Sequence, residues 1–269
     1  PNDSNHMIAG TDGGIHWSHD GGRNWDFVNT LPLGQFYEIG VDMQKPYRIC
    51  GGLQDNGSWC GPSSTLYTRG ITNDEWVNVG GGDGFYVKID PTDPDILYSE
   101  SQDGNVSRRN LKTGESKLIR PREKEGEARF RFQWNSPIVI SSHDPKTIYY
   151  GGNFLFKSTD RGDNWVKASP DLTSGVDRNS LPIMGRKASR DILSLNDGVN
   201  SYPCITTISE STRVPQVIWV GTDDGNLQVT RDGAKTWKNV ADRVPGVPRG
   251  TYVSRVEASH HEEGTAYAT

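Results

Sequence analysis

Ser158-Thr-Asp160-Arg-Gly162-Asp-Asn-Trp165 is one of three copies of a short signature in this chain of 269 residues. The other copies are Ser18-His-Asp20-Gly-Gly22-Arg-Asn-Trp25 and Thr230-Arg-Asp232-Gly-Ala234-Lys-Thr-Trp237. Each copy lies between two short strand-like runs, so the signature predicts the turn of a β-hairpin. We expect the Asp carboxylate to accept N–H groups of the turn, the Gly to adopt a positive φ, and the Trp to fold back over the hairpin. The residues predicted to be structural are Asp20, Trp25, Asp160, Trp165, Asp232 and Trp237.

The composition excludes several classes of protein. Hydrophobic residues make up only 33% of the chain, yet it contains 8 Trp, 10 Tyr and 31 Gly. This mixture is typical of many short strands joined by tight turns, and not of a helix bundle. The net charge is −5 and there is no basic stripe, so a nucleic acid is not expected as a partner. No apolar run approaches the ~18–20 residues of a membrane-spanning helix.

Cofactor and metal motifs are missing from the sequence. The His and Cys residues do not have the spacing of a metal site, and no phosphate loop or dinucleotide fingerprint occurs, so we expect no metal and no cofactor. Cys50 and Cys60 flank a turn centred near Asp55 and could face each other across a hairpin as a disulfide, and two ordinary buried thiols are the alternative. Cys204 has no partner in either case, so the cysteines do not decide the redox compartment.

A longer repeat connects the three signatures. Each unit contains an inner strand, a Pro/Asp turn, a second strand ending in Gly, an Asp-Gly or Asn-Gly turn, a third strand, the signature turn and a fourth strand. Asp20 and Asp160 lie about 140 residues apart, which is three units of about 47 residues and close to the ~40–50 residues of a propeller blade. The sequence therefore predicts an all-β protein, a β-propeller with four-stranded antiparallel blades.

The repeat also predicts where the blades begin and end. The complete blades are expected at 35–79, 84–120, 132–169 and 203–240, with partial blades at 6–30 and 251–269 and a long insertion between blades at 170–202. Both partial blades supply a second strand, so they overlap and do not complement each other in a closed ring. We therefore expect this chain to be part of a longer polypeptide.

One face of such a propeller is the natural place for a ligand. The first strand of each blade lines the axis, so the turns between second and third strands share a face with the connections between blades, opposite the signature turns. We call it the mouth face. It should collect carboxylate, amide and aromatic side chains suited to a sugar or a peptide. The candidate ligand-binding residues are Gln54, Asn56, Asp103, Arg131, Trp134, Asn153 and Asp223. A plain turn role stays open for Asp103, Asp223 and Asp224, because Asp-Gly pairs favour tight turns by themselves.

The signatures and several longer phrases resemble the BNR or Asp-box repeat family of β-propellers. Gly51-Gly-Leu-Gln-Asp-Asn-Gly57, Tyr149-Tyr-Gly-Gly-Asn153 and Ser169-Pro-Asp-Leu-Thr173 look like large secreted bacterial proteins described as sortilin-like or as BNR-repeat glycosyl hydrolases. The resemblance covers nearly the whole chain. It implies an extracellular or periplasmic propeller that binds a glycan, a peptide or a partner protein, or serves as a scaffold.

The alternative to a binding propeller is an enzyme, and two kinds of enzyme related to that family can be compared with this chain. Sialidases carry an Arg-Ile-Pro phrase, and the nearest phrase here, Arg48-Ile49-Cys50, lacks the proline, so sialidase activity is not expected. Xyloglucanase-type enzymes, which this chain also resembles, use two Asp across a cleft, and an inverting pair needs about 6.5–9.5 Å between its carboxyl groups. Asp55 and Asp83 are the candidate catalytic pair, because each borders a Gly-rich approach on adjacent blades. A binding propeller and a glycoside hydrolase both remain open.

Overall fold

The computed structural model describes residues 3–11, 14–28, 34–193, 195, 198–199 and 201–269. The predicted units at 6–30 and 170–202 include residues 12–13, 29–30, 194, 196–197 and 200, which lie outside the described residues. The described strands form antiparallel sheets, which we label A to G in chain order.

The strands of the sheets have the following bounds. Sheet A contains β1 (Met7–Thr11), β2 (Gly14–Ser18) and β3 (Asp26–Phe27); sheet B contains β4 (Phe36–Val41), β5 (Arg48–Leu53), β6 (Gly57–Pro62) and β7 (Val77–Gly80); sheet C contains β8 (Gly84–Ile89), β9 (Ile96–Ser101), β10 (Asn105–Asn110) and β11 (Ser116–Leu118). Sheet D contains β12 (Ile138–Ile140), β13 (Ile148–Gly151), β14 (Leu155–Ser158) and β15 (Val166–Lys167); sheet E contains β16 (Pro182–Ile183) and β17 (Arg186–Lys187). Sheet F contains β18 (Ile205–Glu210), β19 (Ile218–Thr222), β20 (Leu227–Thr230) and β21 (Lys238–Asn239); sheet G contains β22 (Val256–Ala258) and β23 (Ala266–Ala268). Short 3-10 turns occur at Asn73–Glu75, Gln102–Gly104, Arg178–Ser180 and Ala241–Arg243.

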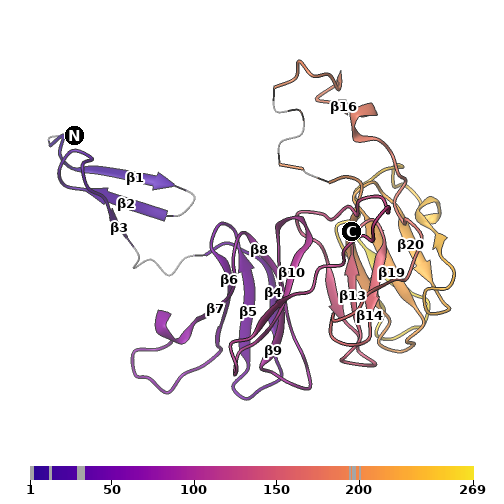
Figure 1. Cartoon of the computed structure of the whole chain (residues 1–269), viewed down its shortest axis with the longest axis horizontal. Helices are drawn as coiled ribbons and strands as arrows, with labels where there is room; N and C mark the ends of the chain where they lie inside the picture. The colour runs from indigo at the N-terminus through magenta and orange to yellow at the C-terminus, as the bar shows by residue number, and fades with distance from the viewer. Residues whose placement is uncertain (1–2, 12–13, 29–33, 194, 196–197, 200) are drawn as a thin grey trace.

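The arrangement of the first strands defines the architecture. In each four-stranded sheet the strands pair in chain order, so the first strand lies at one edge. The first strands of successive sheets are neighbours: β4 lies beside β8, β8 beside β12, β12 beside β18, and β18 beside β22. Sheets B, C, D and F therefore stand side by side around a common axis, while sheet A lies apart from them (Figure 1). The prediction of an all-β propeller is confirmed.

The apolar core consists of layers between neighbouring sheets. Tyr98 of sheet C packs with Phe132, Tyr150 and Phe156 against sheet D. Other layers join sheets D and F, sheets B and C, and sheets F and G. Each buried aromatic or aliphatic side chain contributes about 1.5–3 kcal/mol relative to an exposed one, so these layers stabilise the order of the blades.

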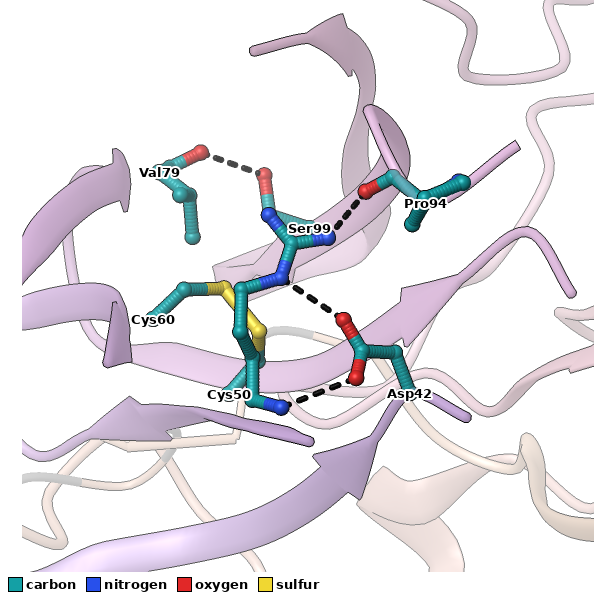
Figure 2. Close-up of a disulfide and its surroundings, with 7 residues drawn as sticks. Asp42, Cys50, Cys60, Val79, Pro94 and Ser99 are labelled. Carbon is teal, nitrogen blue, oxygen red and sulfur yellow. Dashed lines mark hydrogen bonds and ion pairs between the residues drawn. A yellow bond between two sulfur atoms is a disulfide. The ribbon is translucent and has the colours of Figure 1, made fainter. Parts of the chain in front are cut away.

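A disulfide closes the second hairpin of sheet B. Cys50 of β5 is opposite Cys60 of β6 in the strand register, and their sulfur atoms are bonded (Figure 2). This resolves the choice between a disulfide and two thiols, while Cys204 is buried and free. Beside the disulfide, the Arg48 guanidinium forms an ion pair with Asp42 at 2.7 Å and donates a hydrogen bond to the carbonyl oxygen of Pro94 (Figure 2). Sheet B is therefore attached to sheet C by polar as well as apolar contacts.

The three signature turns share one hydrogen-bond pattern. Asp160 Oδ1 accepts the Asn164 N–H at 2.8 Å and the Ser158 hydroxyl at 2.7 Å, while Asp160 Oδ2 accepts the Asn164 side-chain amide at 2.7 Å. Gly162, at a φ of +88°, donates its N–H to Ser158 Oγ at 2.8 Å. The hydrogen bonds from Asn164 and Ser158 lower the pKa of Asp160 to about 2. Asp20 and Asp232 accept the corresponding bonds from Asn24 and Thr236.

The indole N–H groups of the three signature tryptophans donate to acceptors in different sheets. Trp25 Nε1 donates to the carbonyl oxygen of Gly22 in its own hairpin at 3.0 Å. Trp165 Nε1 donates instead to the carbonyl oxygen of Ile119, next to β11 of sheet C, at 2.6 Å, and Trp237 Nε1 donates to Ala168, next to β15 of sheet D, at 3.3 Å. Two of the three indoles thus connect their blade to the preceding one, which is more than the hairpin cover that the sequence predicts.

Candidate functional site

The mouth face is built by turns and connections of several sheets. It contains the turns β5–β6, β9–β10, β13–β14 and β19–β20, together with the connections that lead from β7, β11, β15 and β21 to the next sheet. The connection between β15 and β18 carries the small sheet E and rises above the rest of the fold in Figure 1. The predicted mouth residues lie on these segments.

Asp55 and Asp83 are in contact, and the contact joins the Asp83 carboxylate to the backbone of Asp55. Asp83 Oδ1 accepts the backbone N–H of Asp55 at 2.5 Å, and the side chain of Asp83 is only 8% exposed. Asp55 occupies the β5–β6 turn with a φ of +61°. The Asp83 carboxylate thus holds the turn of the neighbouring sheet, and a catalytic role for the pair stays a prediction.

Tyr37 lies beside these two aspartates. Its ring stacks on Phe85 with the centroids 4.6 Å apart. Burial and the negative charges of Asp83 and Asp55 raise the pKa of Tyr37. A tyrosine that remains 38% exposed thus stands next to a pair of acidic residues on the mouth face.

The remaining candidates of sheets B and C lie in tight turns. The side-chain amide of Asn56 donates to the carbonyl oxygen of Gln54 at 3.0 Å, and the Asn56 carbonyl oxygen accepts Trp59 Nε1 at 2.7 Å. Asp103 has a φ of +62° in the turn after β9. These residues therefore shape their turns, and their ligand-binding role stays a prediction.

Arg131 and Asn153 form a network at the base of the long insertion. Arg131 donates from Nη2 to Asp171 at 2.8 Å and from Nε to the carbonyl oxygen of Pro203 at 2.9 Å. Asn153 accepts the Arg131 N–H at 3.0 Å and donates to Asp171 at 2.8 Å. Burial by itself would raise the pKa of Asp171, but hydrogen bonds from Thr173 and Asn153 outweigh it and lower that pKa. The network fastens both ends of the insertion to sheet D.

Asp223 and Asp224 occupy an enclosed polar position of the mouth face. Their side chains are 7% and 8% exposed. Asp223 accepts the Cys204 N–H and the side-chain amide of Gln133, each at 2.8 Å. Burial, together with the charge of Asp224, raises the pKa of Asp223 to about 7. Asp223 is therefore a carboxyl group that can hold a proton near neutral pH.

Residues far away in the sequence surround this acidic pair. Gln133 also accepts the Trp134 N–H at 2.8 Å, which places the candidate Trp134 next to it. Burial and the charge of Asp223 raise the pKa of both Tyr202 and Tyr252, and Asp224 contributes at Tyr202. The sequence did not single out Gln133, Tyr202 or Tyr252, because they lie in connections without a repeat pattern.

The mouth face thus presents two groups of tyrosine and aspartate. The charges of Asp83 and Asp55 act on Tyr37, the charges of Asp223 and Asp224 act on Tyr202, and the charge of Asp223 acts on Tyr252. Carboxylates accept hydrogen bonds from hydroxyl groups, and tyrosine offers an apolar ring with a polar tip. Among the described residues, no three His, Cys, Asp or Glu side chains are grouped as a metal site. Within the same residues, no helix is both long and apolar enough to cross a membrane.

Known proteins resemble this chain at low sequence identity. No family model matches it. An oligoxyloglucan-reducing end-specific xyloglucanase of Emericella nidulans is 24% identical over 196 residues, which are 70% of this chain and 21% of that enzyme. The structure of an ancestral GH74 enzyme matches 97% of this chain and 32% of its own length, with a TM-score of 0.53 and 16% identity.

A second solved structure supports the same fold. Sqt1 of Saccharomyces cerevisiae matches 98% of this chain and 63% of its own length, with a TM-score of 0.51 and 13% identity. At such identities the likeness shows the propeller fold alone. The chain spans about a fifth of the xyloglucanase and about a third of the GH74 structure.

Proposed function

We propose that this chain is part of an exported Asp-box β-propeller, sortilin-like in its use as a binding module, that holds a glycan on its mouth face. The observation that carries the proposal is that the charges of aspartates at two places on that face raise the pKa of nearby tyrosines. Sugars present hydroxyl groups at their edges and an apolar ring face, and this combination matches carboxylate acceptors beside aromatic rings. A peptide or a partner protein would be the other class of ligand.

In both places on the mouth face, the side chains that a ligand can reach are the tyrosine rings. Tyr37 is 38% and Tyr252 is 51% exposed, whereas the aspartates beside them are held by backbone and side-chain donors of the protein. A ligand would therefore pack on the rings first and use the remaining lone pairs of the carboxylates for its hydroxyl groups. Such a division of roles fits binding better than bond cleavage.

Glycoside hydrolysis is the second candidate, and one observation favours it. A general acid needs a carboxyl group that is protonated near the working pH, and Asp223 has a pKa raised to about 7. The similarity to a xyloglucanase and to a GH74 enzyme points in the same direction. Asp55 and Asp83 remain the proposed catalytic pair of this alternative.

Export is part of the proposal. The Cys50–Cys60 disulfide supports it, because disulfides form and persist in oxidising compartments such as the periplasm and the extracellular space.

Glycan binding tests the proposal directly. The chain is applied to an array of soluble polysaccharides and oligosaccharides, and the affinity of any ligand is then measured by calorimetry for Tyr37→Ala and Tyr252→Ala. We expect each variant to bind at least about 10-fold more weakly, because it loses an aromatic contact. Tyr67→Ala is the matched control, since Tyr67 is 69% exposed in the loop between β6 and β7 on the opposite face.

Two outcomes separate the candidates. Binding without product formation, lost in the mouth variants only, supports a binding module. Release of shorter products that stops in Asp223→Asn, Asp55→Asn or Asp83→Asn, with folding intact, supports the hydrolase. A chain that binds no glycan, or that loses binding equally in Tyr67→Ala, contradicts both.

A further inference from the structure

The space between sheets B and C is filled differently from the space between sheets C and D. The connection from β11 to β12 sends Phe130 and Phe132 into the layer between C and D, where both are buried. The connection from β7 to β8 contains only Gly81, Gly82 and Asp83. The glycines have no side chains, and Asp83 is directed to Asp55, so this connection brings no apolar group between B and C.

The side chains that each sheet directs toward the preceding sheet also differ between sheets C and D. In sheet D, Tyr150 of β13 pairs with Phe156 of β14, and both rings stack with Phe132 in the layer that faces sheet C. In sheet C, the corresponding pair of the second and third strands is Ser99 with Ser107. Two aromatic rings are thus replaced by two hydroxymethyl groups where the glycine connection also leaves space.

The result is a polar groove of about 260 Å³ between β7 and sheet C. The groove is lined by Asn78, Ser99, Ser101, Asn105, Ser107 and Arg109. Gly81 forms part of its wall, and a Cβ built on Gly81 would meet no atom within 4 Å. The groove therefore has room for several water molecules or for one sugar ring.

The walls of the groove are held in place by the protein. The Ser99 hydroxyl donates to the carbonyl oxygen of Val79 at 3.0 Å, and Arg109 Nη1 donates to the carbonyl oxygen of Asn78 at 3.1 Å. The only acidic residue of the lining, Glu100, directs Oε1 to the N–H of Ser136 in the connection to sheet D. Hydroxyl, carboxamide and guanidinium groups therefore dominate the surface that a ligand would meet.

We propose that the groove between sheets B and C binds a single sugar unit, at a site separate from the tyrosines of the mouth face. The proposal deepens the proposed function and rests on it for the class of ligand. An interface between blades gains stability when apolar groups fill it, so a polar void of this size gives up packing energy. Neutral hydroxyl and amide groups match the hydroxyl groups of a sugar ring, and a lone arginine that is already bound to a carbonyl offers little to a strongly charged anion.

Filling the groove is the sharpest test. Ser107→Phe copies Phe156 of sheet D into the equivalent position and should occupy the space. Methyl glycosides of common hexoses and pentoses are titrated into the isotope-labelled chain, and binding is followed by the amide shifts of β9 and β10. A glycoside that shifts these amides in the wild type should bind at least about 10-fold more weakly to Ser107→Phe. Ser64→Phe, the same change at an exposed position between β6 and β7, should leave its affinity unchanged.

A second variant guards against misfolding of the first. Ser101→Ala combined with Asn105→Ala removes two polar groups without adding volume, and should weaken the same glycoside by about 10-fold, as expected for the loss of two hydrogen bonds. The proposal is overturned when no methyl glycoside shifts β9 and β10, or when both variants fold and bind like the wild type. Longer glycans that still require Tyr37 and Tyr252 would then leave the proposed function intact, whereas failure of every glycan would end both proposals.

Discussion

The Asp83 carboxylate accepts the backbone N–H of Asp55 at 2.5 Å, and this contact joins sheets B and C at the mouth face. The backbones of the two sheets also approach closely beside this contact. A Cβ on Gly52 would lie only 2.0 Å from the carbonyl carbon of Gly84, so no side chain fits there. Gly57 N–H also donates to the carbonyl oxygen of Gly82 at 2.8 Å. The Gly-rich approaches around the two aspartates therefore let one blade contact the next.

Removing this carboxylate should loosen the contact between the blades. A hydrogen bond to a charged acceptor contributes about 1.5–3 kcal/mol, so Asp83→Ala should lower the free energy of unfolding by roughly that amount. Asp55→Ala keeps the N–H donor and should cost less. Urea unfolding followed by tryptophan fluorescence measures both, and an equal or larger loss for Asp55→Ala would contradict the assignment.

The indole of Trp165 should contribute more to stability than the indole of Trp25. Trp165→Phe keeps an aromatic ring but loses the hydrogen bond to Ile119 between sheets D and C, at a cost of about 1–2 kcal/mol. Trp25→Phe is the matched control, because its bond to Gly22 stays within one hairpin of sheet A. Thermal unfolding of the two variants tests the difference, and equal shifts in Tm would argue against a role between blades.

The Cys50–Cys60 disulfide should stabilise sheet B. It closes a short loop with a sequence separation of 10 residues, for which the loss of unfolded-state entropy predicts about 2–3 kcal/mol. The double variant Cys50→Ala, Cys60→Ala should unfold at lower urea, and a reductant should shift the wild type but not the variant. A thiol assay on the denatured, unreduced wild type should find Cys204 alone, and three thiols would refute the disulfide.

Stability should depend on pH through Asp223. Its pKa is raised to about 7 in the folded chain, against about 3.9 for an unfolded aspartate. The folded state therefore binds more protons between these values, so the free energy of unfolding falls as the pH rises from about 4 to 7. At about 1.4 kcal/mol for each pKa unit, the fall due to Asp223 reaches at most about 4 kcal/mol.

A variant that cannot ionise isolates this effect. Asp223→Asn should flatten the pH profile of stability over the same range, while Asp26→Asn, at an exposed position of β3, should not. Burial also raises the pKa of Glu100 and adds a slope of the same sign, but that slope is common to the wild type and both variants. Parallel profiles for the wild type and Asp223→Asn would show that folding leaves the pKa of Asp223 unchanged, and would contradict this prediction.

Much of the candidate site was out of reach of sequence reasoning. Asp55 and Asp83 were paired because both border glycines on neighbouring blades, and their contact spans only 28 positions. Gln133 and Asp223 are 90 positions apart, and Arg131 lies 72 positions from Pro203, whose carbonyl oxygen it binds. No local pattern marks such partners, since loops that pass over the mouth face bring them together.

The sequence by itself determined the hairpin turns and the all-β class, because Ser158, Asp160 and Asn164 complete their hydrogen bonds within one turn. Only the tertiary structure decided that the Trp165 indole reaches Ile119 and that serines, not aromatic rings, face the gap beside β7. The physical reason is the distance along the sequence over which each kind of contact acts. Bonds inside a turn depend on a few neighbouring residues, whereas contacts between blades depend on how long each connection is and what side chains it inserts between the sheets.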